Sequence, residues 1–148
     1  PISLIRYEQA LVRYPQHLQL VHDYPRTLLL ERRFADVVRF TEQALQMRRG
    51  DAKLHQMAAE AYAAQGNAMQ SFHHQGEYYA ARGDSSSAIE QLELALRADS
   101  GQGANMRDLL VIEARLKALL GSQPQEASQN APAGERFARL TQPQKKPR

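Results

Sequence analysis

The sequence predicts an all-α protein, an array of helical hairpins with about seven helices. The phrase Tyr62-Ala-Ala-Gln-Gly66-Asn67 returns as Tyr79-Ala-Ala-Arg-Gly83-Asp84, 17 residues later, and 17 is half of a 34-residue helical repeat. Ala, Leu, Gln, Arg and Glu dominate the composition, and all of them favour helices. Apolar residues also recur at helical spacing through most of residues 1–120.

The first three helices are expected over residues 2–14, 16–31 and 34–48. The first ends at Tyr14-Pro15, because the residue before a proline avoids the helical conformation. The second contains Pro25, which removes a backbone donor and predicts a kink or a late start. The third carries a broad apolar face and ends in two cations and a glycine at 48–50.

Four further helices are expected over 52–65, 68–82, 86–98 and a last segment that starts at Asn105 or Asp108 and is bounded by Gly121. Asp51 can cap the fourth helix, and Asp84 or Ser85 can cap the sixth. Gly66 and Gly83 close the fourth and fifth helices, since glycine tolerates the positive φ of a helix terminus.

The chain divides into a helical domain over 1–121 and a tail over 122–148. The tail is rich in Ser, Gln, Pro, Ala and Gly, so we expect it to be disordered and basic, with a docking turn over 134–141 as the alternative. Residues 1–120 hold 14 basic and 14 acidic side chains, so the net charge of +3 belongs to the tail, with 5 basic and 2 acidic.

A neutral array lacks the basic stripe that nucleic acid requires, and we expect no nucleic-acid partner. Association of the basic tail with nucleic acid or an anionic membrane is a third-ranked hypothesis. It predicts salt-sensitive binding that disappears when 122–148 is deleted. No apolar run reaches the roughly 18 residues of a spanning helix, so no transmembrane segment is expected.

Residues 69–102 resemble a tetratricopeptide repeat. With Tyr79 at repeat position 11, the small and apolar positions of that pattern fall on Phe72, Gly76, Ala88, Leu92 and Ala95. The resemblance implies an α-α superhelix of tetratricopeptide-type hairpins, whose groove binds a protein or peptide. The repeat frame of residues 1–62 is offset by half a repeat from that of 69–102, which an unpaired helix over 52–65 would explain.

Three longer runs are more particular, namely 54–62, 88–97 and 112–116. They resemble the C-terminal repeat domain of bacterial periplasmic M48-type zinc metalloproteases, the group that includes the β-barrel assembly-enhancing protease. The resemblance covers about residues 1–120. It implies a periplasmic location, a zinc protease domain upstream, and binding to the outer-membrane barrel assembly machinery or its substrates. A start at Pro1 also suggests a processed or excised piece.

The alternative is a stand-alone tetratricopeptide scaffold for an envelope, secretion or pilus complex. The two hypotheses differ in what they predict upstream of Pro1. A metalloprotease would carry a His-Glu-x-x-His helix and a signal peptide there.

The chain itself is expected to be non-catalytic, with no metal and no cofactor. It contains no Cys and no His-Glu dipeptide, which the zinc site of such proteases requires. The histidines lack metal-ligand spacing and are expected to face solvent or line a groove; they are His17, His22, His55, His73 and His74. Ser85-Ser86-Ser87 is interpreted as capping and turn residues.

The candidate protein-binding residues are polar side chains on the presumed inward helices. They are His22, Arg26, Lys53, Gln56, Glu60, His73, Glu77 and Glu90, with the choice between His73 and Glu77 or Glu90 depending on the repeat frame. Their mixed charge lacks the Lys/Arg clamp that holds a terminal carboxylate. Tyr62 and Tyr79 occupy repeat positions that are typical of interior packing.

Overall fold

The computed structural model describes residues 3–98 and 105–122, and all regular structure in these ranges is α-helical. The elements are α1 (Leu4–Arg13), α2 (Leu18–Leu30), α3 (Phe34–Met47), α4 (Ala52–Ala64), α5 (Ala68–Ala81), α6 (Ser85–Arg97) and α7 (Met106–Gly121). The prediction of an all-α array with seven helices is therefore confirmed. The expected disordered tail and its docking turn lie outside the described residues, apart from Ser122.

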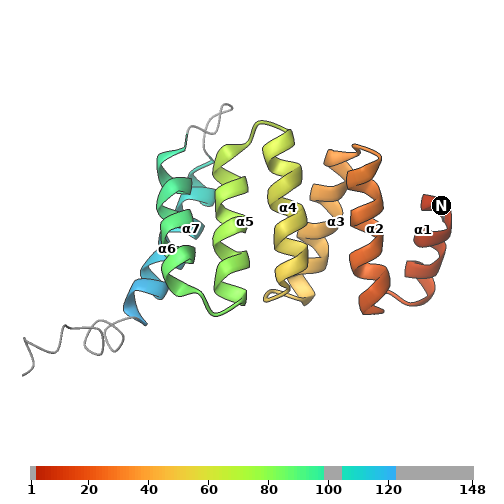
Figure 1. Ribbon diagram of the computed structural model, residues 1–148, viewed down its shortest axis with the longest axis horizontal. Coiled ribbons are helices and arrows are strands. Elements are labelled where there is room, and N and C mark those ends of the chain that lie inside the picture. Colours follow the sequence, from red (N-terminus) through yellow and green to blue (C-terminus); the bar gives the residue numbers. More distant parts are fainter. Residues whose placement is uncertain (1–2, 99–104, 123–148) are drawn as a thin grey trace, which may run out of the picture.

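The helices form an array in which each helix packs against the next one in the chain. Figure 1 shows α2, α4, α5 and α6 in a front row, with α3 and α7 behind them. Helix α2 also contacts α4, so α3 lies behind a pair of adjacent front helices. Within the part of the chain that is described, no helix has both the length and the apolar character needed to cross a membrane.

Three helices end with the same backbone motif. After α4, the amide of Asn67 donates to the carbonyl of Tyr62 at 2.9 Å, and Gly66 has a φ of +77°. After α5, Gly83 has a φ of +80° and the same bond pattern, as predicted for both glycines. The third case is α2, where Arg32 adopts the left-handed conformation with a φ of +56°. The predicted end of this helix at residue 31 lies one residue beyond Leu30, but the left-handed conformation of Arg32 was not predicted.

Side-chain caps begin four of the seven described helices. Asp51 accepts a hydrogen bond from the amide of Leu54, and Asp84 accepts one from the amide of Ser87, so Asp84 caps the sixth helix. Asn67 and Asn105 cap α5 and α7. Pro25 lies buried inside α2, which starts at Leu18, two residues after the predicted start.

The core has two parts that meet between α4 and α5. One buried cluster comes from α2, α3 and α4, and contains Val21, Leu28, Val37, Leu45, Leu54, Met57 and Ala61. The other comes from α5, α6 and α7, and contains Met69, Ala88, Leu92, Ala95, Ile112 and Leu119. Where the two meet, the Ser71 hydroxyl donates to the carbonyl of Ala59 at 2.9 Å. The contact between α4 and α5 is thus partly polar. It lies at the position where the sequence predicts a break in the repeat frame.

The sequence spacing of α5 matches that of a back-row helix, but α5 packs as a front-row helix. It starts at residue 68, which is 34 after the start of α3 at 34, just as α4 at 52 follows α2 at 18. Yet α5 lies in the front row instead of behind it (Figure 1). Its Gly76 packs directly on Leu92 of α6, where a Cβ would come within 2.9 Å. The back row is therefore interrupted between α3 and α7.

Candidate protein-binding groove

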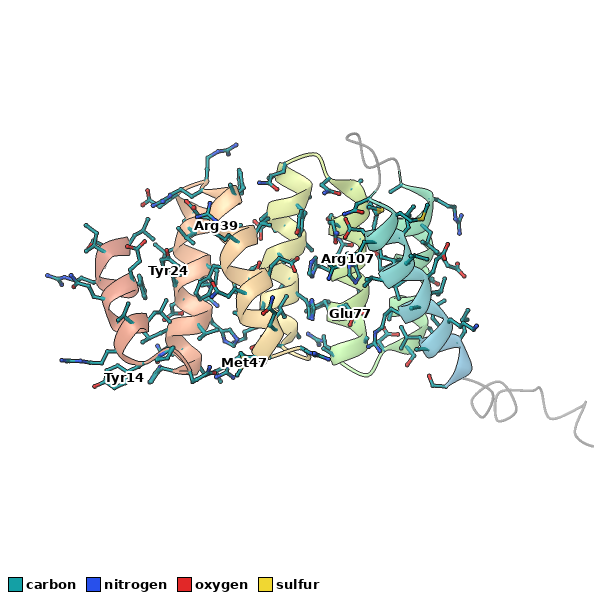
Figure 2. All side chains as sticks on the ribbon, turned by 180° about the vertical axis from the view of Figure 1, so that it is seen from behind. Tyr14, Tyr24, Arg39, Met47, Glu77 and Arg107 are labelled. Carbon is teal, nitrogen blue, oxygen red and sulfur yellow. The ribbon has the colours of Figure 1, made fainter. Side chains whose placement is uncertain are left out.

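A groove with a volume of about 800 Å³ lies at this interruption, on the rear face of the array. We call it the α5–α7 groove. Its lining comes from the α3–α4 turn, α5 and α7, and consists of Arg49, Gly50, His73, Glu77, Ala80, Ala81, Val111, Ala114, Arg115 and Ala118. Figure 2 views this face, with Glu77 beside α7. Four alanines make much of the surface, so a bound chain can approach the helix backbones closely.

An ion pair bridges the two helices of the groove. The Nε–H of Arg115 donates to Oε1 of Glu77 at 2.7 Å. The Glu77 side chain is 16% exposed and that of Arg115 is 41% exposed, so the carboxylate is half-buried while solvent reaches the guanidinium. Such a pair contributes little to stability, and α7 is positioned mainly by its packing on α6.

His73 adds an uncharged polar group to the groove at neutral pH. Burial, together with the nearby His74, lowers the pKa of His73 to about 4. Its Nδ1 lies 3.1 Å from Oε1 of Gln70, one turn earlier on α5. The charges of the groove lining at pH 7 are therefore those of Glu77, Arg115 and Arg49.

The structure brings two pairs of the predicted binding residues to two different surfaces. His73 and Glu77 line the α5–α7 groove. Gln56 and Glu60 line a smaller pocket of about 320 Å³ between α4 and α5, together with Ala59, Gln75, Tyr78 and Tyr79. Residues 75, 78 and 79 lie on the opposite side of α5 from 73 and 77, as expected at 100° per residue. The two surfaces are thus separate.

The other predicted residues lie apart from both pairs. His22 is half-buried, and its Nε2 lies 2.7 Å from Oδ2 of Asp51, the residue that caps α4. Arg26 is exposed and pairs with Asp23 on its own helix at 3.4 Å. Lys53 and Glu90 are exposed on α4 and α6 and line none of the described pockets. The eight residues therefore do not form one surface.

A second large cleft lies at the other end of the array, with a volume of about 480 Å³. Its lining is mostly apolar and comes from α1, the start of α2 and the end of α3. Val12 and Met47 on its walls are 86% and 74% exposed. None of the predicted binding residues lines this cleft.

Two histidines contradict the expectation that histidines face solvent or a groove. His55 and His74 are only 6% and 4% exposed. They lie where α4 and α5 pack together, and their ring nitrogens all lie within hydrogen-bonding distance of polar atoms, which makes their burial tolerable. Local sequence patterns could not indicate these partners, because they come from segments 6 to 32 residues away.

Sequence reasoning also missed Arg49, Arg115 and the alanines of α7. The only hint was the spacing of Ala114 and Ala118, one helical turn apart, which places two small residues on one face. Among the described residues, no group of three or more His, Cys, Asp or Glu side chains is arranged to hold a metal ion.

No family model, curated protein or solved structure matches this chain. Its function must therefore be inferred from the geometry of the groove and from the sequence patterns.

Proposed function

We propose that the chain is a tetratricopeptide-type interaction domain that binds a segment of another protein in the α5–α7 groove. The observation that supports this most directly is the groove itself, which opens where the back row of helices is interrupted. Helical arrays bind partners along such concave surfaces, because successive helices supply side chains at regular intervals. The Tyr-x-x-x-Gly echo and the close contact of Gly76 with Leu92 support the tetratricopeptide type.

The lining indicates the chemistry of the bound segment. Ala80, Ala114 and Ala118 favour a segment whose own side chains are apolar and fill the space above them. The Arg49 guanidinium forms no salt bridge with any described carboxylate, whereas Arg115 is paired with Glu77. An acidic side chain on the partner would pair with Arg49 at the wall of the groove. We therefore propose a partner segment that combines apolar residues with at least one carboxylate.

The more specific proposal is that this is the non-catalytic C-terminal domain of a periplasmic M48-type zinc metalloprotease. The runs 54–62, 88–97 and 112–116 support it by resemblance. In that role the groove would present substrates to the protease, or dock the protease on the outer-membrane barrel assembly machinery. Zinc would then belong to the upstream protease domain.

Groove binding can be tested with peptides selected from a phage-displayed random 16-residue library against the full chain. We expect selected peptides to be apolar with an acidic residue, and Ala114→Arg to weaken their binding at least tenfold by filling the groove. Ala64→Arg is the matched control, because Ala64 is exposed on α4 and lines no described pocket. Equal binding by both variants would place the peptide site elsewhere.

The protease proposal has an independent test in the parent gene. We expect the reading frame upstream of Pro1 to encode a signal peptide and a His-Glu-x-x-His helix. A frame without either would remove the metalloprotease proposal and favour the stand-alone scaffold, while leaving groove binding unaffected.

A further inference from the structure

Two buried imidazole rings meet at the join between the two halves of the array. Nδ1 of His55 on α4 lies 3.0 Å from Nδ1 of His74 on α5. The other nitrogen of His55, Nε2, lies 2.8 Å from the carbonyl oxygen of Arg49 in the α3–α4 turn. Nε2 of His74 lies 2.7 Å from Oε1 of Glu42 on α3. The chain of three contacts thus links α3, the turn after it, α4 and α5.

The protons on this chain can be counted from the chemistry of its two ends. A carbonyl oxygen only accepts, so His55 must carry a proton on Nε2. An ionised Glu42 also only accepts, so His74 must carry a proton on Nε2. If both rings were neutral, both Nδ1 atoms would then be bare, and two lone pairs would face each other at 3.0 Å. A third proton between the two Nδ1 atoms converts this repulsion into a hydrogen bond.

We propose that His55 and His74 form a buried binding site for one shared proton, which joins the α3–α4 turn and α4 to α5. The two rings together carry one positive charge, and the Glu42 carboxylate balances it. This inference goes beyond partner binding, since the count rests on His55, His74 and their hydrogen-bond partners alone.

The groups around the pair agree with a single proton. On α3, the hydrogen bond with His74 lowers the pKa of Glu42, which keeps this carboxyl ionised. On α4, burial lowers the pKa of His55, which disfavours a second proton on the pair. Tyr62 donates its hydroxyl proton to Glu42 at 3.1 Å and stacks on His74 with ring centroids 5.5 Å apart.

The remaining titratable side chains around the His55–His74 pair come from α5 and α7. His73 lies beside His74, with ring centroids 5.2 Å apart, and its lowered pKa keeps it neutral at pH 7. Glu77, also on α5, acts on His55 through its charge and is itself paired with Arg115 of α7. Glu42 is therefore the carboxylate in direct contact with the pair, and it is the appropriate counter-ion for the shared proton.

The shared proton makes the join sensitive to pH in both directions. Loss of the proton leaves two lone pairs in contact, and gain of a second proton brings two N–H groups together. Either change would push the two rings apart and weaken the hydrogen bond between His55 and the carbonyl of Arg49. Because Arg49 also lines the α5–α7 groove, the groove wall would change with it.

The proton can be counted directly in the full-length wild-type chain labelled with ¹⁵N-histidine. Long-range ¹H–¹⁵N correlation spectra from pH 5 to 9 report the state of each ring nitrogen. Near pH 7 we expect both Nε2 atoms protonated and one proton on the two Nδ1 atoms. Above the pH at which that proton is lost, the protection of the His55 amide, which donates to the carbonyl of Asp51, should fall at least tenfold relative to the intrinsic exchange rate at the same pH. Two bare Nδ1 atoms in a folded protein at pH 7 would overturn the proposal.

A bound Zn²⁺ ion is the rival explanation for two facing Nδ1 atoms, and the same sample distinguishes it. Stoichiometric zinc in the purified protein, with Nδ1 signals that change on adding a chelator, would replace the proton by a metal. Glu42→Gln removes the counter-charge and should lower the pH at which the bridging proton is lost by at least one unit. Glu113→Gln, an exposed change on α7, should not shift it. An unshifted midpoint in Glu42→Gln would also overturn the proposal.

Discussion

Gly76 on α5 lies so close to Leu92 on α6 that a Cβ on Gly76 would be 2.9 Å from Cγ of Leu92. The carbonyl oxygen of Ala88 would lie 3.2 Å from the same Cβ, and backbone cannot move aside easily. Leu92 is fully buried, which limits its freedom to change rotamer. The contact therefore requires the absence of a side chain at position 76.

We predict that Gly76→Ala destabilises the protein, although alanine is the better helix former. The gain in helix propensity is about 1 kcal/mol, while overpacking costs about 1–3 kcal/mol. The net loss should be about 1 kcal/mol, measured by urea unfolding. Gly121→Ala is the control, because nothing lies within 4 Å of a Cβ there. A stabilised Gly76→Ala variant would mean that α5 and α6 are packed less closely.

Arg32 and Gly66 occupy equivalent helix ends but should respond oppositely to substitution. Both are left-handed, with φ values of +56° and +77°. A left-handed residue other than glycine costs roughly 1–2 kcal/mol. Arg32→Gly should therefore stabilise the protein by about 0.5–1 kcal/mol, while Gly66→Ala should destabilise it by about 1 kcal/mol. Thermal unfolding of the two variants checks the signs, and equal signs would contradict the assigned conformations.

The fold was predictable from the sequence because helix ends and apolar faces are local features. Asp51, Gly66 and Gly83 each act on residues within one turn, so their positions alone indicated where α4 and α5 begin or end. The break in the repeat was also visible, as the 17-residue echo. The left-handed conformation of Arg32 was not predicted, because arginine has no preference for positive φ.

The candidate site was only partly predictable, because it depends on contacts between distant segments. Glu77 meets Arg115 across 38 residues, and His74 meets Glu42 across 32. No local sequence pattern indicates such pairs. The sequence therefore predicted His73 and Glu77 as binding residues but did not predict which residues contact them. The position of α5 in the front row determines which of its sides faces the groove. The sequence allowed two repeat frames, so it did not predict the row to which α5 belongs.

Acid should destabilise the protein through His73. Its pKa is about 4 in the folded state and near the ordinary 6.5 when unfolded, so between these values the unfolded chain binds more protons. The contribution of His73 to stability is therefore complete above pH 6.5 and falls as the pH decreases toward 4. The loss from this half-buried ring should be on the order of 2 kcal/mol. Urea unfolding at intervals across this range measures it.

His73→Gln isolates this contribution from those of Glu42 and His55, whose lowered pKa values act in the same direction. The variant should show a shallower fall in the free energy of unfolding between pH 6.5 and 4. His17→Gln, at an exposed site, should retain the wild-type slope. An unchanged slope in His73→Gln would show that the folded state does not resist protonation of His73.

The ion pair between Arg115 and Glu77 should matter more for binding than for stability. Because the guanidinium is 41% exposed, a double-mutant cycle with Arg115→Ala and Glu77→Ala should give a coupling energy below about 1 kcal/mol. The pair nevertheless spans the groove between α5 and α7, and both residues line it. Arg115→Ala should therefore weaken a groove-selected peptide at least fivefold, as measured by fluorescence anisotropy.

Arg107→Ala is the matched control for this last prediction, since Arg107 is an exposed arginine on the same helix that does not line the groove. Figure 2 labels it, and its position in the sequence places it in the first turn of α7. If loss of positive charge on α7 were the cause of weaker binding, the two variants would lose affinity equally. If the cause is the width of the groove, only Arg115→Ala should lose affinity, and the loss should persist in high salt, where long-range attraction is screened.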